Sequence, residues 1–256
     1  MLIVLSPAKS LDYESPIRLK DATLPDMLDD AERLVGRMRT YGPSQLAALM
    51  SISDPLAALN VARFAQWHRP FEAGNARQAV LAFDGDVYGG LDARTLKPAA
   101  LRWAQSRVRI LSGLYGVLRP LDLMQPYRLE MGTRFDTGRG PSLYAFWGAR
   151  VAHALEAALD GHRHRVLVNL ASEEYFKAVD RAALSVPVVQ PVFQEWKSGQ
   201  WKVISFSAKR ARGLMARHAV EHRIEDPRKL QAFDAEGYAF DAAASDASTW
   251  YFRRRA

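Results

Sequence analysis

The sequence predicts an α+β fold, in which one domain over residues 1–256 holds a mixed sheet surrounded by helices. The chain length and the hydrophobic fraction of 48% suit one large buried core. Short apolar runs typical of buried strands occur between segments with helical spacing. They follow one another without the regular strand–helix alternation of a doubly wound parallel sheet, so we expect an α+β arrangement.

The N-terminal part of the chain is expected to contain one strand and three helices. Met1–Leu5 is an apolar run that stops at a Ser-Pro pair, which predicts a buried strand. Residues 24–40 place apolar side chains every three or four positions and end at Gly42-Pro43, which predicts an amphipathic helix. Ser44 is a typical N-cap for the next helix, and Pro55 suits the first turn of the one that follows.

The remainder of the chain is expected to alternate irregularly between strands and helices. Apolar runs predict buried strands, two runs that flank a Lys-Ser-Gly-Gln turn predict a hairpin, and amphipathic spacing predicts helices. The expected strands are 79–83, 108–111, 165–171, 187–193, 201–206 and 249–252. The expected helices are 144–159 and 207–222.

The composition excludes several kinds of site and indicates a compartment. The chain has no cysteine, so it forms no disulfide and no Cys-ligated zinc or iron–sulfur centre. That absence fits a reducing cytoplasm. The apolar run Leu2–Leu5 is too short for a secretory signal, and no apolar stretch approaches the ~20 residues that cross a bilayer. We therefore expect a cytoplasmic protein that makes no membrane contact, and we favour a monomer.

Positive charge is concentrated in two stretches that contain no Asp or Glu. Residues 93–121 and 196–220 each contain six Lys or Arg residues. The rest of the chain has 23 cations against 28 carboxylates and is mildly acidic. If the two basic stretches meet in the fold, they form one anion-binding surface, for which nucleic acid is the commonest large partner. The alternative is a basic surface without a specific partner.

Polar side chains follow four of the predicted strands. Strand ends in mixed sheets open into crevices where ligands usually bind, so these side chains predict one shared polar cleft. The competing interpretation is that strand ends are polar simply because loops are solvated. The predicted cleft residues are Ser6, Lys9, Tyr115, Tyr127, Asn169 and Glu174.

Four sequence blocks are similar to the peroxide-stress protein YaaA family. They are Leu5–Asp12, Leu111–Gly132, Asn169–Phe176 and Ala208–Met215, of which the 22-residue second block is the most specific. The resemblance implies a single-domain bacterial cytoplasmic protein with an unusual fold. It also implies protection against hydrogen peroxide by limiting unincorporated iron. DNA binding through a positive cleft and a helix–hairpin–helix element is a further implication. No catalytic residue and no cofactor come with the family.

Residues 44–67 are the candidate helix–hairpin–helix. The usual pattern Leu-Pro-Gly-Ile-Gly, with Ala four residues later, aligns with the run from Leu49 to Ser53 followed by Ala57. Ser51 and Ser53 replace the two glycines and lack their freedom at positive φ. The alternative is a plain helical hairpin with a serine-rich turn.

The preferred prediction is a DNA-binding protein for duplex or branched DNA with little sequence preference. The hairpin backbone and two groups of cations are expected to meet phosphates. The predicted DNA-binding residues are Ser51, Ile52, Ser53, Asp54, Arg119, Arg128, Lys209, Arg210, Arg212 and Arg217. We expect no cofactor and no metal site, although His218 and His222 have the spacing of an inverted zinc-protease motif.

Two other functions stay open at this point. The chain would be an enzyme acting on nucleic acid or on a small anion if Lys9 or Lys209 formed a Schiff base, with Glu130 and Glu174 as further catalytic candidates. The second helix of the candidate hairpin lacks the lysine of helix–hairpin–helix glycosylases, which departs from that enzyme pattern. The third possibility is an iron-handling or partner-binding protein whose basic cleft holds a small anion.

Overall fold

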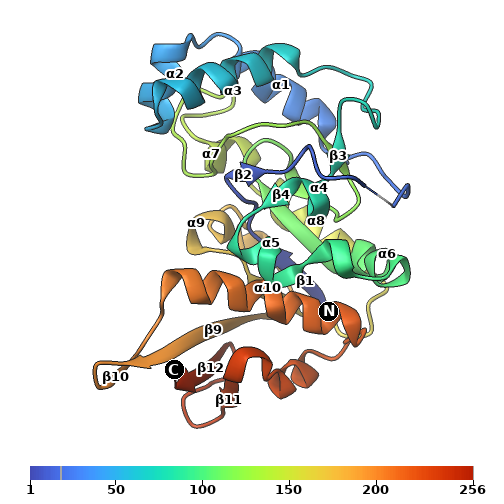
Figure 1. Cartoon of the computed structure of the whole chain (residues 1–256), viewed down its shortest axis with the longest axis vertical. Coiled ribbons are helices and arrows are strands. Elements are labelled where there is room, and N and C mark those ends of the chain that lie inside the picture. Colours follow the sequence, from blue (N-terminus) through green and yellow to red (C-terminus); the bar gives the residue numbers. More distant parts are fainter. Residues whose placement is uncertain (18, 256) are drawn as a thin grey trace.

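The computed structural model describes residues 1–17 and 19–255, and its centre is an eight-stranded mixed sheet (Figure 1). The strand order is β11-β12-β9-β8-β1-β5-β6, and β10 pairs with β9. The strands are β1 (Leu2–Leu5), β5 (Val108–Ser112), β6 (Gly116–Leu118), β8 (Leu167–Leu170), β9 (Val188–Lys197), β10 (Gln200–Lys202), β11 (Ala239–Asp241) and β12 (Thr249–Arg255).

Five neighbouring strands of this sheet are parallel, which makes the fold α/β. β1 pairs in parallel with β5 and β8, β8 pairs with β9, and β9 pairs with β12. The antiparallel pairs involve β6, β10 and β11. The prediction of a single mixed sheet flanked by helices is confirmed, whereas the α+β class is wrong. The crossover from β1 to β5 spans residues 6–107 and contains several helices, which hides the regular alternation from sequence reading.

The connections carry two short two-stranded sheets and the helices. The short sheets pair β2 (Ser10–Leu11) with β4 (Phe83–Asp84) and β3 (Arg77–Gln78) with β7 (Leu123–Met124). The α-helices are α1 (Leu28–Met38), α2 (Pro43–Met50), α3 (Asp54–Gln66), α4 (Ala79–Ala82), α5 (Asp86–Leu91), α6 (Pro98–Arg107), α7 (Leu143–Trp147), α8 (Arg150–Leu159), α9 (Glu173–Phe176) and α10 (Ser205–Glu221). The 3₁₀ helices are η1 (Ala93–Thr95), η2 (Arg181–Ala183), η3 (Pro227–Ala232) and η4 (Ala235–Gly237).

Most predicted elements are present, with three local corrections. The strand expected over 201–206 ends at Lys202, and Ser205 and Phe206 begin α10. The strand expected over 79–83 is mainly the helical turn α4, whose residues are all buried, and a short buried apolar run does not distinguish helix from strand. The helix expected over 144–159 is divided into α7 and α8 at Gly148, whose φ of +49° interrupts the helical backbone. The hairpin expected around Lys197–Gln200 is formed by β9 and β10, as predicted.

The basic helix α10 packs on α5 through two glycines, and Figure 1 shows the two helices side by side. A Cβ atom on Gly213 of α10 would overlap the carbonyl oxygen of Val87 in α5. A Cβ atom on Gly90 of α5 would overlap the carbonyl oxygen of Arg210 in α10. The two backbones therefore touch directly, which fixes α10 against α5 while it also packs on β8 and β9.

The central strands form the middle of the hydrophobic core. All four residues of β1 are fully buried, and the side chains of β8 are nearly so. The three-helix group α1–α3 lies at one end of the molecule, and the β9–β12 part of the sheet lies at the other (Figure 1). Over the part of the chain that the structure describes, no helix combines the length and apolar character needed to cross a membrane.

Candidate nucleic-acid interface and strand-end site

The carboxyl ends of β1 and β8 lie side by side because the two strands are parallel neighbours. Ser6 follows β1 and Ser172 follows β8. The backbone N–H of Ser172 donates a hydrogen bond to Ser6 Oγ at 2.8 Å, and Ser6 Oγ donates one to Ser172 Oγ at 3.2 Å. The Tyr88 hydroxyl donates to the carbonyl oxygen of Ser6 at 2.9 Å. These bonds fix the backbone at one edge of the sheet, where α/β proteins usually bind ligands.

A charged triplet lies next to these strand ends and joins residues far apart in sequence. Lys9 Nζ is 2.8 Å from Glu130 Oε2, and Arg128 Nη2 donates to Glu130 Oε1 at 2.9 Å. Burial opposes ionisation of Glu130, but the hydrogen bonds and charges of Lys9 and Arg128 outweigh it and lower the pKa of this carboxyl. Arg128 Nε is buried without a hydrogen-bond partner among the described atoms. We call Ser6, Lys9, Arg128, Glu130, Ser172 and Glu174 the strand-end site.

Glu174 joins the strand-end site through the backbone of the segment after Glu130. The N–H of Gly132 donates to Glu174 Oε1 at 2.9 Å. Burial raises the pKa of the neighbouring Tyr175, and the negative charges of Glu174 and Glu130 add to that effect. The side chain of Glu174 itself is exposed. The site therefore offers two carboxylates and two cations next to buried hydroxyl groups.

The other three predicted cleft residues, Tyr115, Tyr127 and Asn169, are buried and form hydrogen bonds inside the protein. Tyr115 is completely buried; its hydroxyl accepts a hydrogen bond from Trp67 Nε1 at 3.0 Å. The hydroxyl groups of Tyr127 and Ser112 are 2.6 Å apart in the core. Asn169 Oδ1 accepts a hydrogen bond from the N–H of Ala171 at 3.0 Å. These polar groups are satisfied within the protein, so their role in the structure is to hold the strand ends in place.

The two basic stretches meet in the fold, but half of their cations are neutralised by acidic side chains from elsewhere. Arg217 Nη1 of α10 donates to Thr95 Oγ1 of the first stretch at 2.9 Å, and to the carbonyl oxygens of Leu91 and Asp92 just before that stretch. Across the described chain, six of the twelve cations form ion pairs. The pairs are Arg94–Asp12, Arg102–Asp21, Arg107–Glu225, Arg119–Asp26 and Asp122, Arg210–Glu236, and Arg217–Asp92 and Glu221.

Several of the predicted phosphate-binding arginines are therefore engaged within the protein. Arg119 Nε donates to Asp122 Oδ1 at 2.9 Å, and its Nη2 lies 3.0 Å from Asp26 Oδ1. Arg119 and Arg109 line a hollow beside α8, whereas α10 packs on α5, β8 and β9. No hydrogen bond or ion pair between described residues joins Arg119 to α10. The structure thus brings the two stretches together near Asp92, and Arg119 lies elsewhere.

Within the second basic stretch, the described cations without a carboxylate partner lie on the β9–β10 hairpin and in the first half of α10. Lys209 is exposed, and Lys197 and Lys202 lie on the β9–β10 hairpin that leads into this helix. Arg212 shares a helix face with the buried Ala208 and is itself half-buried, and burial lowers the pKa of its guanidinium. Phe206, one turn before Lys209, is an aromatic ring with 64% of its surface exposed. This group combines uncompensated positive charge with an accessible ring.

Over the candidate segment 44–67, α2 and α3 pack together as a helical hairpin, and the predicted helix–hairpin–helix element is not confirmed. Ser51 adopts the left-handed conformation with φ of 52°, which a glycine would enter with less strain. Ser53 precedes α3 without forming a side-chain cap, so the first turn of α3 keeps unbonded N–H groups. Asp54 opens the helix with a negative charge. Contact between Ser51, Ile52, Ser53 or Asp54 and DNA stays a prediction.

The zinc-protease spacing does not form a metal-binding arrangement. The rings of His218 and His222 lie 4.5 Å apart, and Glu221 is paired with Arg217 at 2.7 Å. The Nδ1 atom of His222 lies 2.9 Å from the carbonyl oxygen of His218. In residues 1–17 and 19–255, no group of three or more His, Cys, Asp or Glu side chains is arranged to hold a metal ion.

The comparison with known families now identifies the chain. A family model described as peroxide stress protein YaaA matches residues 1–244. The chain belongs to this family. It is 62% identical over 256 residues to a UPF0246 protein of Ralstonia nicotianae, with both chains fully covered. It is 61% identical over 255 residues to a UPF0246 protein of Ralstonia pickettii, covering all of this chain and 99% of that one.

A third bacterial relative, a UPF0246 protein of Paraburkholderia phytofirmans, is 60% identical over 257 residues, covering all of this chain and 99% of that one. The sequence-based resemblance to the YaaA family is thus confirmed. Three of the four blocks that carry it contribute to the strand-end site. The first supplies Lys9, the second Arg128 and Glu130, and the third Ser172 and Glu174. The fourth block lies in α10, which packs on β8.

Proposed function

We propose that this YaaA-family chain is a DNA-binding protein of the hydrogen peroxide response, which limits unincorporated iron and DNA damage. The observation that carries the proposal is the group of unpaired cations at the β9–β10 hairpin and the start of α10. Lys197, Lys202 and Lys209 have no carboxylate partner among the described residues. Each such cation that meets a phosphate releases a condensed counterion, which favours binding without sequence preference.

The exposed ring of Phe206 favours branched DNA over uninterrupted duplex. Phe206 and Lys209 are three residues apart on α10 and therefore project from the same side of the helix. A phenyl ring beside a cation suits an unstacked base and its phosphate, because every base presents a π face. Branch points expose such bases, whereas an uninterrupted duplex keeps them stacked.

The other predicted DNA-binding residues should contribute less to phosphate binding than this group of unpaired cations. Arg119, Arg128, Arg210 and Arg217 each form an ion pair, so a phosphate has to compete with a carboxylate for them. The first turn of α3 offers backbone N–H groups and a partial positive charge, which Asp54 partly offsets. We therefore assign the largest share of the phosphate contacts to Lys209 and Arg212.

A salt titration of DNA affinity tests this proposal. Fluorescence anisotropy with a labelled four-way junction, repeated over a range of salt concentrations, gives the logarithmic slope. The double variant K209A/R212A should flatten that slope by about one to two units, because up to two phosphate contacts are lost. The control is R102A, which removes an exposed arginine already paired with Asp21. An unchanged slope in the double variant would exclude α10 from the interface.

The strand-end site supports a second candidate function, an enzyme acting on nucleic acid or on a small anion. Two carboxylates and two cations converge at the carboxyl ends of parallel strands, where many α/β enzymes bind substrates. Lys9 Nζ is already engaged by Glu130, so a substrate carbonyl would have to displace that carboxylate before Lys9 could attack it. Lys209 has no such partner in the described chain.

Covalent trapping distinguishes the two functions. Borohydride reduction on DNA with an abasic site would link the protein to DNA if either lysine forms a Schiff base. The variants K9A and K209A identify the lysine responsible, and absence of an adduct in the unmodified protein counts against the lyase mechanism. Equilibrium dialysis with ferrous iron, run alongside the DNA titration, tests the iron-handling alternative.

A further inference from the structure

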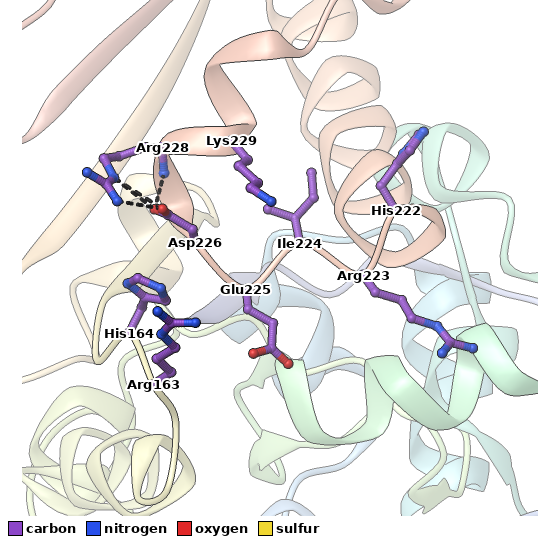
Figure 2. Close-up of a pocket in the computed structure, with 9 residues that line it drawn as sticks. All are labelled: Arg163, His164, His222, Arg223, Ile224, Glu225, Asp226, Arg228 and Lys229. Atoms are coloured by element: carbon purple, nitrogen blue, oxygen red, sulfur yellow. Dashed lines mark hydrogen bonds and ion pairs between the residues drawn. The ribbon is translucent and has the colours of Figure 1, made fainter.

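A second basic hollow lies at the opposite end of α10 from Lys209. It has a volume of about 340 Å³. The residues that line it are Arg163, His164, His222, Arg223, Ile224, Glu225, Asp226, Arg228 and Lys229 (Figure 2). The 13 residues from Lys209 to the end of the helix correspond to about 20 Å of helix length. Arg163 and His164 precede β8, so the hollow is at the other edge of the sheet from the strand-end site.

The carboxylates of this hollow are already engaged by other arginines. Asp226 accepts hydrogen bonds from Arg228, the shortest at 2.7 Å, and Glu225 accepts one from Arg107 at 2.9 Å. Burial opposes ionisation of Asp226, but the stronger hydrogen bond from Arg228 lowers the pKa of this carboxyl to about 2. The acidic side chains are therefore charged and paired, and they leave the remaining cations uncompensated.

Three cations line the hollow without an ion pair to any described residue. They are Arg163, Arg223 and Lys229. Figure 2 shows Arg163 with His164 on one side of Glu225, Lys229 on another, and Arg223 farther along the hollow. All three side chains are exposed and come from two separate segments of the chain, so the fold brings them to one hollow. Their positive charges favour an anion as its occupant.

The surroundings of the hollow carry further positive charge. Two nitrogens of Arg107, Nε and Nη1, are buried without a partner among the described atoms. Nδ1 of the neighbouring His162 is also buried and unpartnered. Burial, followed by the charge of Arg107, lowers the pKa of His162 to about 4, so this ring stays neutral at pH 7. The neighbourhood of His162 therefore already resists additional positive charge.

We propose that this hollow binds a small anion that carries a phosphate group, with Arg163 and Lys229 as its principal contacts. A forked guanidinium and a lysine ammonium are the usual donors to phosphate oxygens. The volume accommodates a phosphate with a small organic substituent and is too small for a folded partner. The site is separate from the proposed DNA interface, so its failure would leave that interface intact.

Calorimetric titration with inorganic phosphate tests the proposal on the full-length protein. The double variant R163A/K229A should weaken phosphate binding by about tenfold or more. The control is R181A, which removes an exposed arginine at the start of η2, outside the hollow. Circular dichroism spectra of all three proteins establish that they are folded. Equal affinity in the double variant, or no binding by the unmodified protein at millimolar phosphate, would overturn the proposal.

Amide NMR shifts provide a second readout that locates the anion. Phosphate should perturb the amide signals of residues 163–164 and 222–229. A short DNA duplex distinguishes the source of the phosphate group. If the duplex displaces phosphate and the double variant binds neither the duplex nor phosphate, the hollow is a nucleic-acid contact and the small-ligand proposal is wrong. If phosphate binds and the duplex leaves these signals unchanged, the small ligand is supported.

Discussion

Replacement of Gly213 by alanine tests the closeness of the α5–α10 contact. The added Cβ would overlap the carbonyl oxygen of Val87 and approach the backbone nitrogen of Leu91. Both neighbours are backbone atoms of a buried helix, so they cannot move aside as a flexible side chain would. Overpacking of this kind costs about 3 kcal/mol or more, and alanine returns about 1 kcal/mol through its higher helix propensity. We expect G213A to lose at least about 2 kcal/mol of unfolding free energy.

Urea unfolding followed by circular dichroism measures this loss, and the chain contains a matched control. Gly36 lies inside α1, and a Cβ added there meets nothing within 4 Å. The same substitution at that position should therefore stabilise the protein, by up to about 1 kcal/mol. If G213A proves as stable as G36A, the close contact between α5 and α10 is not real, and the placement of the basic helix has to be revised.

Three further predictions concern the interior and the surface. Asp122 is 1% exposed and accepts hydrogen bonds from the backbone N–H of Arg119 at 2.7 Å and from Thr23 at 2.5 Å. Urea unfolding of D122A should therefore show a loss of about 3–5 kcal/mol of unfolding free energy. A loss below about 1 kcal/mol would contradict a structural role for this buried carboxylate. The pKa of His162 falls to about 4 in the folded protein, so the unfolded chain binds more protons than the folded protein between pH 4 and 6.5. The unfolding free energy should therefore rise with pH across this window. Urea titrations at several pH values should show a smaller rise in H162Q. F206A should change stability by less than about 0.5 kcal/mol because the ring is exposed, yet weaken junction binding more than duplex binding in a parallel anisotropy titration.

Local sequence patterns predicted the central elements because those elements depend mainly on apolar periodicity. The strands at Leu2–Leu5 and Leu167–Leu170 lie where the sequence placed them, and the basic helix expected over 207–222 is α10, which begins two residues earlier at Ser205. The parallel order of the strands was missed. Strand direction depends on the path of the crossovers, of which the one from β1 to β5 spans residues 6–107, and apolar spacing does not encode that path.

The candidate site was predicted in composition but not in its electrostatics. The sequence singled out Lys9, Arg128 and Glu130 as separate residues, and the structure joins them in one triplet. Because the two basic stretches contain no Asp or Glu, the sequence also predicts that their cations lack carboxylate partners. Arg107 pairs with Glu225, which lies 118 positions later in the sequence, and no local sequence pattern predicts such a pair. Ion pairs between residues far apart in sequence therefore determine which cations remain available to bind phosphate.

The place of β1 in the sheet order affects how the protein is made. This strand leaves the ribosome well before its two neighbours, β5 and β8, which begin at Val108 and Leu167. Until those segments have been synthesised, the apolar sequence Leu-Ile-Val-Leu has no native edge to pair with. The nascent chain therefore exposes its most hydrophobic strand for much of translation, the period in which a holdase chaperone offers the greatest protection against aggregation.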